Sequence, residues 1–142
     1  MFGIEEVHTQ GNDPRWNMPY TPALKVHGGS LIFVAGVTAA PVYHSHPHRP
    51  EEFTSIPGDA GEQASMALDH LEEVLSAAGA SLDDLVQLFR FIVDIDRNQD
   101  AINAVLAARM TRRATSTTVE VTRLATDARL VLELTAVAAV PG

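Results

Sequence analysis

The sequence contains no cysteine, and basic residues are scarce: 10 Lys and Arg stand against 18 Asp and Glu in 142 residues. The absence of cysteine excludes disulfides, a thiolate nucleophile and a cysteine-ligated zinc site. The formal net charge of −8 repels a phosphate backbone, and the basic residues form no stripe that would offset it. We therefore expect no nucleic-acid partner.

Long hydrophobic runs and targeting signals are missing as well. Apolar stretches such as Leu31–Val37 have the length of a strand and are too short to span a bilayer, so we expect no membrane partner. Met1–Glu6 lacks the basic start and apolar core of a signal peptide, which makes the cytoplasm the expected location. No phosphate-binding loop or Ser-His-Asp order occurs, and we expect no cofactor and assign no metal ligand.

The periodicity of apolar residues predicts one α+β domain over residues 1–142. Asp59 is placed to cap a helix with an apolar stripe at three- and four-residue spacing, and Gly79 to end it. A strand over Leu85–Val93 and a second helix over Asn98–Met110 follow, and the economical packing places both helices on one face of a mixed sheet. Further strands are predicted at Leu31–Val37 (buried), Thr117–Arg123 and Arg129–Ala138, and irregular segments at Gly11–Pro22 and Ala39–Pro57.

The strand Leu85–Val93 is apolar on both sides. Because side chains alternate along a strand, Val86, Leu88 and Ile92 point opposite to Phe89, Phe91 and Val93. Two helices cannot cover both faces of such a sheet. The sequence therefore predicts an oligomer.

Three segments together resemble the Rid family of reactive intermediate deaminases, also called the YjgF family. They are the run from Gly58 to Asp94, the strand TTVEVTRL at Thr117–Leu124, and the strand LVLELTAV at Leu130–Val137. The resemblance implies a chorismate-mutase-like fold and a homotrimer whose sheets line a central barrel. It also implies that enamines or imines are hydrolysed in clefts between subunits.

The family's cleft residues match this chain unevenly. Its Pro-Tyr-(Ser/Thr) motif resembles Pro19-Tyr20-Thr21, its helix asparagine resembles Asn103, and its strand glycine resembles Gly36. The resemblance therefore implies that Tyr20 and Asn103 shape and polarise the substrate, while Gly36 lets it approach the backbone.

Two family residues that carry the chemistry are replaced. The arginine that binds the substrate carboxylate is Ser116 here, and serine supplies no positive charge. The glutamate that orients the hydrolytic water is Val131, which leaves Glu133 two positions later on the same strand face. Glu133 either takes over the acid/base role or is a structural, hydrogen-bonded glutamate.

Other residues are candidates for holding the polar end of a substrate. Arg90 lies within an apolar strand, where its head either reaches solvent, pairs with a protein carboxylate or binds a ligand carboxylate. Ser116 and Thr117 either bind a small anion or are ordinary strand residues. Trp16 either lines the cleft with Tyr20 or packs within its arm. Three arginines near the end of the second helix are expected in solvent, unless one of them reaches the cleft of a neighbouring subunit: Arg109, Arg112 and Arg113.

The family does not explain the three alternating histidines His44, His46 and His48. They form a solvated loop, a lid that brings one histidine to the cleft, or a metal-chelating set. Pro47 and Pro50 favour a loop, and no carboxylate lies within the motif.

The sequence thus predicts a divergent Rid-like deaminase that acts on a small-molecule enamine or imine. Its predicted catalytic residues are Glu133, Tyr20 and Asn103, and its predicted substrate-binding residues are Ser116, Thr117, Arg90, Gly36 and Trp16. Two alternatives remain: a non-catalytic trimer that binds a small molecule, and metal-dependent chemistry through the segment His44–His48.

Overall fold

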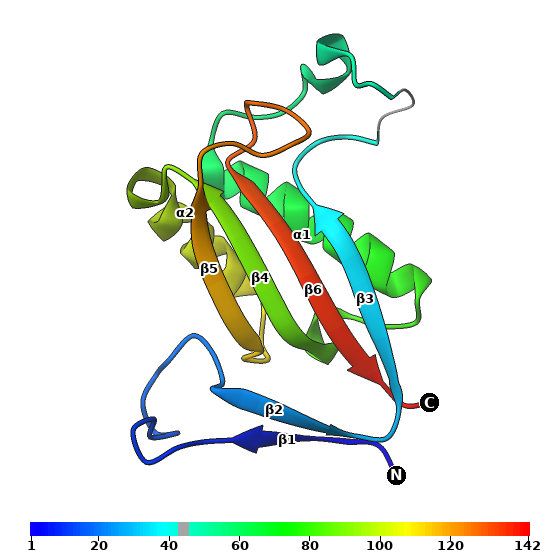
Figure 1. Cartoon of the computed structure of the whole chain (residues 1–142), viewed down its shortest axis with the longest axis vertical. Helices are drawn as coiled ribbons and strands as arrows, with labels where there is room; N and C mark the ends of the chain where they lie inside the picture. Colours follow the sequence, from blue (N-terminus) through cyan, green and yellow to red (C-terminus); the bar gives the residue numbers. More distant parts are fainter. Residues whose placement is uncertain (43–45) are drawn as a thin grey trace.

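The computed structural model describes residues 1–42 and 46–142. It contains a hairpin, a separate sheet with helices behind it, and a long connection at one end of that sheet (Figure 1). In chain order the elements are β1 (Gly3–Val7), β2 (Ala23–His27), β3 (Ser30–Val37), η1 (Pro50–Phe53), α1 (Ala60–Ala77), η2 (Leu82–Asp84), β4 (Leu85–Val93), α2 (Ile95–Arg109), β5 (Thr115–Val121) and β6 (Leu132–Val140).

The main sheet has the strand order β3-β6-β4-β5, in which only the β4–β5 pair is parallel. Both helices lie behind this sheet, on one face (Figure 1). The core between the two layers is formed mainly by Leu68, Leu71 and Leu75 of α1 with Leu132 and Leu134 of β6, all fully buried. The predicted α+β architecture is confirmed.

The predicted helix caps explain why α1 begins and ends where it does. The Asp59 carboxylate accepts a hydrogen bond of 2.9 Å from the backbone N–H of Glu62. Gly79 follows the helix with φ of +76°, a conformation that glycine adopts without strain. Strand β4 has the predicted bounds Leu85–Val93.

The second helix begins three residues earlier than predicted, at Ile95 rather than Asn98. Asp94 precedes it in the left-handed region, with φ of +49°. The Asn98 side chain lies inside the first turn and donates to the carbonyl of Val93 at 2.7 Å. This bond satisfies a backbone oxygen at the end of β4.

The hairpin β1–β2 is absent from the sequence-based prediction. Its strands are short and partly polar, and the pairing places Glu5 opposite Lys25 and Gly3 opposite His27. The hairpin leads into β3 through Gly28 and Gly29, which both have positive φ. A Cβ atom at Gly29 would lie 2.4 Å from both the Phe2 side chain and the Val140 carbonyl oxygen, so the turn requires glycine.

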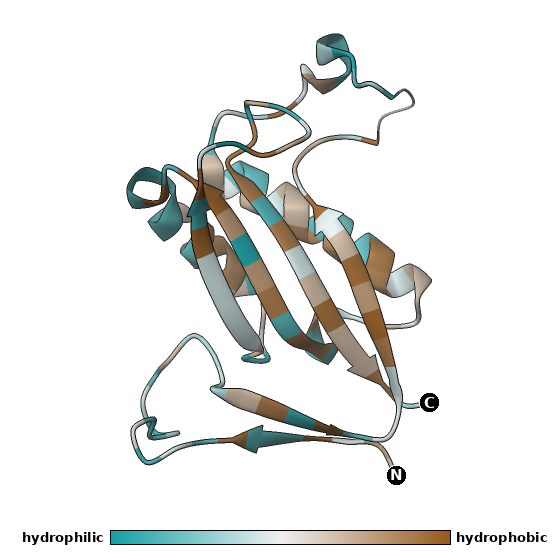
Figure 2. Ribbon diagram, in the orientation of Figure 1, coloured by the Kyte–Doolittle hydropathy of each residue, from teal (hydrophilic) through white to brown (hydrophobic). Residues whose placement is uncertain are grey.

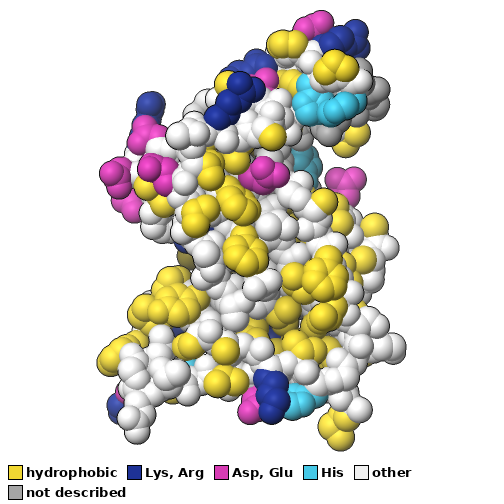
Figure 3. Space-filling view, in the orientation of Figure 1, with side chains coloured by type: hydrophobic (Ala, Val, Ile, Leu, Met, Phe, Trp, Pro, Cys, Tyr) yellow, Lys and Arg dark blue, Asp and Glu magenta, His cyan; other side chains and the backbone are white. Residues whose placement is uncertain are grey.

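The sheet face opposite the helices is open and apolar. Leu31 and Phe33 on β3 are 52% and 76% exposed, which corrects the prediction of a buried strand there. Val119 on β5 is exposed as well. Hydrophobic side chains gather over this face in the space-filling view (Figure 3), and hydrophobic residues run along β3, β4 and β6 (Figure 2). Within one chain, this face has no covering layer among the described residues.

Described residues on both sides of positions 43–45, in the ranges 39–42 and 46–57, contribute to a small second core. Phe53 is 1% exposed and packs with Ala39, Ile56, Leu124 and Leu130, so these residues are held against the β5–β6 connection. The ring of His48 contacts Phe53 edge-on, with centroids 5.6 Å apart, and His46 contacts His48 in the same manner. His44 lies outside the described residues.

One buried glutamine ties α1 to the start of β6. The Gln63 side chain is fully buried, donates to the carbonyls of Pro57 and Arg129 at 2.8 and 2.9 Å, and accepts from the Val131 N–H at 2.8 Å.

Substituting Gln63→Leu is expected to lower the free energy of unfolding by about 2–4 kcal/mol, because it leaves two carbonyls and one N–H buried without partners. Urea unfolding monitored by circular dichroism measures this change, and the exposed Gln10→Leu serves as the matched control. Equal stability of both variants would contradict the structural role given to Gln63.

Candidate active site

A cavity of about 720 Å³ lies where α2, β4 and β5 meet the segment Asn17–Tyr20. Its walls combine an apolar part with a polar cluster. Apolar residues lining it include Leu88, Leu106, Ala107 and Met110, and polar residues include Tyr20, Arg90, Asn103, Ser116 and Thr118. Four of the residues predicted for the site thus line one cavity: Tyr20, Arg90, Asn103 and Ser116.

Arg90 is the centre of the polar cluster. Its Nε donates to Thr118 Oγ1 at 2.8 Å, and its Nη1 donates to Asn103 Oδ1 at 2.5 Å. Of its five N–H groups, three therefore remain without a partner in the described part of the chain. Burial lowers the pKa of the Arg90 guanidinium, but an arginine stays protonated at neutral pH.

The partners of Arg90 leave its positive charge uncompensated. The Thr118 hydroxyl and the Asn103 amide are neutral, and they orient the guanidinium without neutralising it. Because arginine only donates, Asn103 must present its oxygen, which leaves its NH₂ group as a donor. The free N–H groups of Arg90 suit a planar carboxylate, which accepts two parallel hydrogen bonds.

The arginine reaches this position because of the strand register. In the parallel β4–β5 pair, Leu88 lies opposite Ser116 and Arg90 opposite Thr118. Ser116 therefore lies on the strand next to that of Arg90, two residues before the register partner of Arg90. Both residues line the same cavity. An arginine on β4 thus supplies a guanidinium beside the position where the Rid family has an arginine on β5.

Tyr20 is fixed to the cavity by the residue that follows it. Thr21 is 3% exposed, its N–H donates to the carbonyl of Ala114 at 3.2 Å, and its hydroxyl donates to the carbonyl of Arg113 at 2.5 Å. The Tyr20 hydroxyl accepts a long hydrogen bond of 3.5 Å from Asn12. The Pro-Tyr-Thr motif is therefore anchored to the segment that enters β5.

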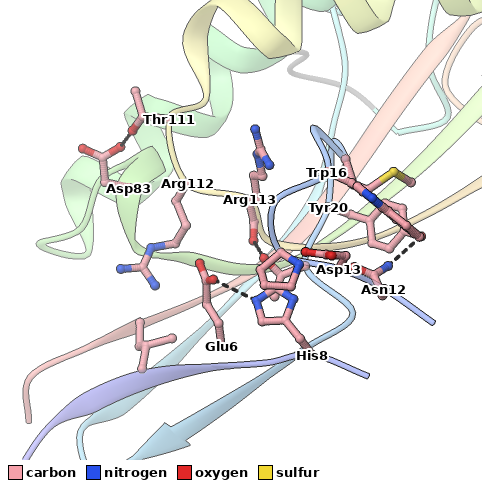
Figure 4. A pocket seen from close by; sticks show the side chains of 14 residues that line it. Glu6, His8, Asn12, Asp13, Trp16, Tyr20, Asp83, Thr111, Arg112 and Arg113 are labelled. Carbon is pink, nitrogen blue, oxygen red and sulfur yellow. Dashed lines mark hydrogen bonds and ion pairs between the residues drawn. The ribbon is translucent and has the colours of Figure 1, made fainter. Parts of the chain in front are cut away.

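A second cavity of about 710 Å³ adjoins the first, beside the hairpin (Figure 4). Trp16 lines this outer cavity and not the inner one. Five residues line both cavities: Met18, Tyr20, Thr111, Arg112 and Arg113. The outer cavity also contains a Glu6–His8 pair at 3.1 Å.

Glu133 and Gly36 lie on the opposite face of the sheet. Arg90 pairs with the buried Leu134 on β6, whereas Glu133 pairs with Phe91, so alternation turns Glu133 toward the open face. A Cβ atom at Gly36 would lie 2.0 Å from Glu133 Oε2, so glycine leaves room for this carboxylate. Burial raises the pKa of Glu133, and it has no hydrogen-bond or ion-pair partner in residues 1–42 and 46–142.

Several residues considered from the sequence lie elsewhere. Thr117 shares the open sheet face with Val119, and Thr118 takes its place in the cavity. Arg109 is not in solvent as expected, because it bonds Asp69 and Glu72 of α1 at 2.8 and 3.1 Å. His46 and His48 pack by Phe53, and neither lines the two cavities.

Sequence reasoning did not identify Thr118 and Asn103 as partners of Arg90. The Thr118 contact depends on the β4–β5 register, and the Asn103 contact depends on how α2 packs against β4. The described residues contain no group of three or more His, Cys, Asp or Glu arranged to hold a metal ion. Within the same residues, no helix is long and apolar enough to cross a membrane.

The fold and the arginine-lined cavity define a small α+β protein with a site suited to an organic anion. A profile of the family described as Endoribonuclease L-PSP matches residues 10–140. A RutC family protein of Sulfurisphaera tokodaii is 32% identical over 126 residues, covering 88% of this chain and 91% of that protein. TdcF of Escherichia coli, a candidate reactive intermediate deaminase, is 30% identical over 124 residues, with coverage of 84% and 86%.

Solved structures of Rid/YjgF proteins have a similar fold. Rv2704 of Mycobacterium tuberculosis, from the YjgF/YER057c/UK114 family, has a TM-score of 0.63 and 28% identity, covering 97% of this chain and 100% of that chain. The Yersinia pestis Rid family protein YyfB has a TM-score of 0.75 at 23% identity, with coverage of 96% and 98%, and supports the fold. The chain belongs to the Rid/YjgF family.

Proposed function

We propose that this protein hydrolyses imines or enamines of 2-amino acids, and that Arg90 holds the substrate carboxylate in place of the family's arginine. The observation that carries the proposal is the Arg90 guanidinium, which is oriented in the cavity by two neutral partners and keeps three N–H groups free. The family position Ser116 lines the same cavity but supplies no charge. Arg90 offers the charge and the planar donor array that serine lacks.

The reaction also needs a group that activates water, and no carboxylate among the described residues lines the inner cavity. Glu133 of the same chain lies on the other sheet face. We therefore assign this role to Glu133 of a second copy, in a cleft between subunits of a homotrimer. The exposed apolar residues Leu31, Phe33 and Val119 support association through the face that carries Glu133.

The chemistry follows from these positions. The Glu133 carboxylate takes a proton from water as the oxygen attacks the imine carbon, and the carboxylic acid then returns this proton to the nitrogen. The resulting carbinolamine transfers its hydroxyl proton to the amino group, breaks its C–N bond and releases ammonia and a 2-keto acid. Tyr20 and the Asn103 NH₂ group donate hydrogen bonds to the developing polar centre. The raised pKa of Glu133 makes it a stronger base than an exposed glutamate.

A small molecule suits this site better than a nucleic acid. The family profile carries the description endoribonuclease, but this chain has a net charge of −8, and three of its ten basic residues line one cavity while the sequence has no basic stripe.

The direct test is release of ammonia from 2-iminopropanoate and 2-iminobutanoate, generated in the assay from the corresponding amino acids by an added oxidase. We expect release above the spontaneous rate, in proportion to protein concentration. TdcF serves as a comparison protein in the same assay. If the protein binds carboxylates but accelerates the hydrolysis of none of the imines tested, the hydrolase proposal is wrong. The alternative of a non-catalytic binding protein would then take its place.

A further inference from the structure

The inner cavity has an unusual charge for an acidic protein. Three arginines line it, Arg90, Arg112 and Arg113, and no carboxylate does among the residues that the structure describes. The chain as a whole has 18 acidic and 10 basic residues. A cavity that gathers three of those ten positive charges attracts small anions even though the outer surface repels them.

None of the three arginines forms an ion pair in the described part of the chain. Arg90 bonds to neutral Thr118 and Asn103. The Arg113 Nη2 donates to the amide oxygen of Asn17 at 2.6 Å, and Arg112 has no hydrogen bond or ion pair there. Of the six other arginines, four are paired with a carboxylate, namely Arg15, Arg49, Arg109 and Arg129. The exposed Arg97 and Arg123 form no ion pair in the described residues.

Among the described residues, the acidic residues of the adjoining outer cavity form no ion pair with these arginines. Glu6 pairs with His8 at 3.1 Å, Asp13 pairs with Arg15 at 2.5 Å, and Asp83 accepts from the Thr111 hydroxyl. Each carboxylate thus has a donor of its own. Arg112 and Arg113 remain available to a ligand.

The positive charges fall into two groups. Arg90 lines only the inner cavity, whereas Arg112 and Arg113 line both cavities and therefore lie where the two meet. Figure 4 shows Arg112 and Arg113 among the residues of the outer cavity. The walls of the inner cavity also include Leu106, Ala107 and Met110, which suit an aliphatic chain. This arrangement matches a molecule with an anionic group at each end and a short carbon chain between them.

We propose that the substrate of this cleft is a small dicarboxylate, the imine or enamine of an acidic 2-amino acid, with one carboxylate on Arg90 and the other on Arg112 and Arg113. The reaction part of this inference rests on the proposed function. The predicted preference for binding a dicarboxylate can be tested without it. A substrate with one carboxylate leaves the second group of arginines without a partner. Charge-assisted hydrogen bonds are about twice as strong as neutral ones, so we expect about a tenfold or greater preference for the dianion.

The test compares matched pairs on the intact protein. Glutarate is expected to bind at least about tenfold more tightly than pentanoate in titration calorimetry. In the ammonia assay, 2-iminoglutarate is expected to exceed 2-iminohexanoate by a similar factor in kcat/KM. The double variant R112Q/R113Q is expected to reduce both ratios toward one. R97Q/R123Q removes two exposed arginines outside both cavities and is the charge-matched control.

The outcomes separate the two proposals. Equal binding of glutarate and pentanoate by the unmodified protein overturns the dicarboxylate inference, whatever the variants do. A preference for glutarate without any imine hydrolysis supports the inference for binding and contradicts the hydrolase. Turnover of both imines with equal kcat/KM keeps the hydrolase and rejects the dicarboxylate. Loss of the preference in R97Q/R123Q would trace it to overall charge instead of the cavity.

Discussion

Replacing Arg90 by glutamine is expected to lower kcat/KM for imine hydrolysis by about 100-fold or more. The change removes a charged, two-pronged donor whose orientation is fixed by Thr118 and Asn103. Because the substrate carboxylate is held in both the ground state and the transition state, most of the loss is expected in KM. Steady-state ammonia release measures it, and thermal unfolding shows whether the variant stays folded.

A second variant makes this prediction specific. Adding S116R to R90Q restores a guanidinium at the family's position, and Ser116 lines the same cavity as Arg90. We expect R90Q/S116R to recover at least about tenfold of the lost kcat/KM. The exposed Arg97→Gln, which lies outside the cavity, controls for net charge. Activity in R90Q equal to that in R97Q would show that Arg90 does not bind the substrate.

Replacing Glu133 by glutamine is expected to lower kcat by about 10²–10⁴-fold while carboxylate binding at Arg90 persists. Glutamine keeps the shape of the side chain beside Gly36 but cannot accept a proton from water. Calorimetry with a non-reactive carboxylate and ammonia release on the same preparation separate the two effects. Unchanged kcat in E133Q would assign the acid/base role to another residue.

The same carboxylate makes a pH dependence testable. Burial raises the pKa of Glu133 above its ordinary value of 4.5, so activity should fall as the pH drops through a value higher than 4.5. Ionisation of Glu133, which is expected to raise activity, is expected to lower the stability of the folded protein. The raised pKa means that ionisation disfavours the folded state, so E133Q should gain stability relative to the unmodified protein as the pH rises above 4.5. Below that pH the difference should vanish, as pH-dependent urea unfolding would reveal.

The elements with strong local signals could be predicted from the sequence. The Asp59 cap, the apolar stripe of α1 and the Gly79 stop define a helix by short-range rules, and β4 is a mostly apolar run interrupted by Gln87 and Arg90. The start of α2 was misplaced because Asp94 adopts a left-handed conformation that no local pattern indicates. The hairpin β1–β2 escaped prediction because its strands are only five residues long and rich in charged residues.

The candidate site depends on contacts that only the tertiary structure defines. The sequence indicated that an arginine within β4 needs a partner, but not that Thr118 and Asn103 provide neutral ones. The reason is that Arg90 meets Thr118 only through the parallel pairing of β4 with β5. In the same way, the spacing of Val131 and Glu133 identified a strand face, while the register with β4 shows that this face lies opposite Arg90.

The most direct measurement for the central claim is subunit complementation. Arg90 and Glu133 lie on opposite faces of one sheet, so a working cleft must take each residue from a different copy. We would co-express differently tagged R90Q and E133Q chains, purify the mixed oligomer and measure ammonia release. In a mixed trimer of either composition, one of the three clefts combines Arg90 of an E133Q chain with Glu133 of an R90Q chain, so activity of about a third of the unmodified level is expected. Mixed oligomers as inactive as either parent would contradict a cleft shared between subunits.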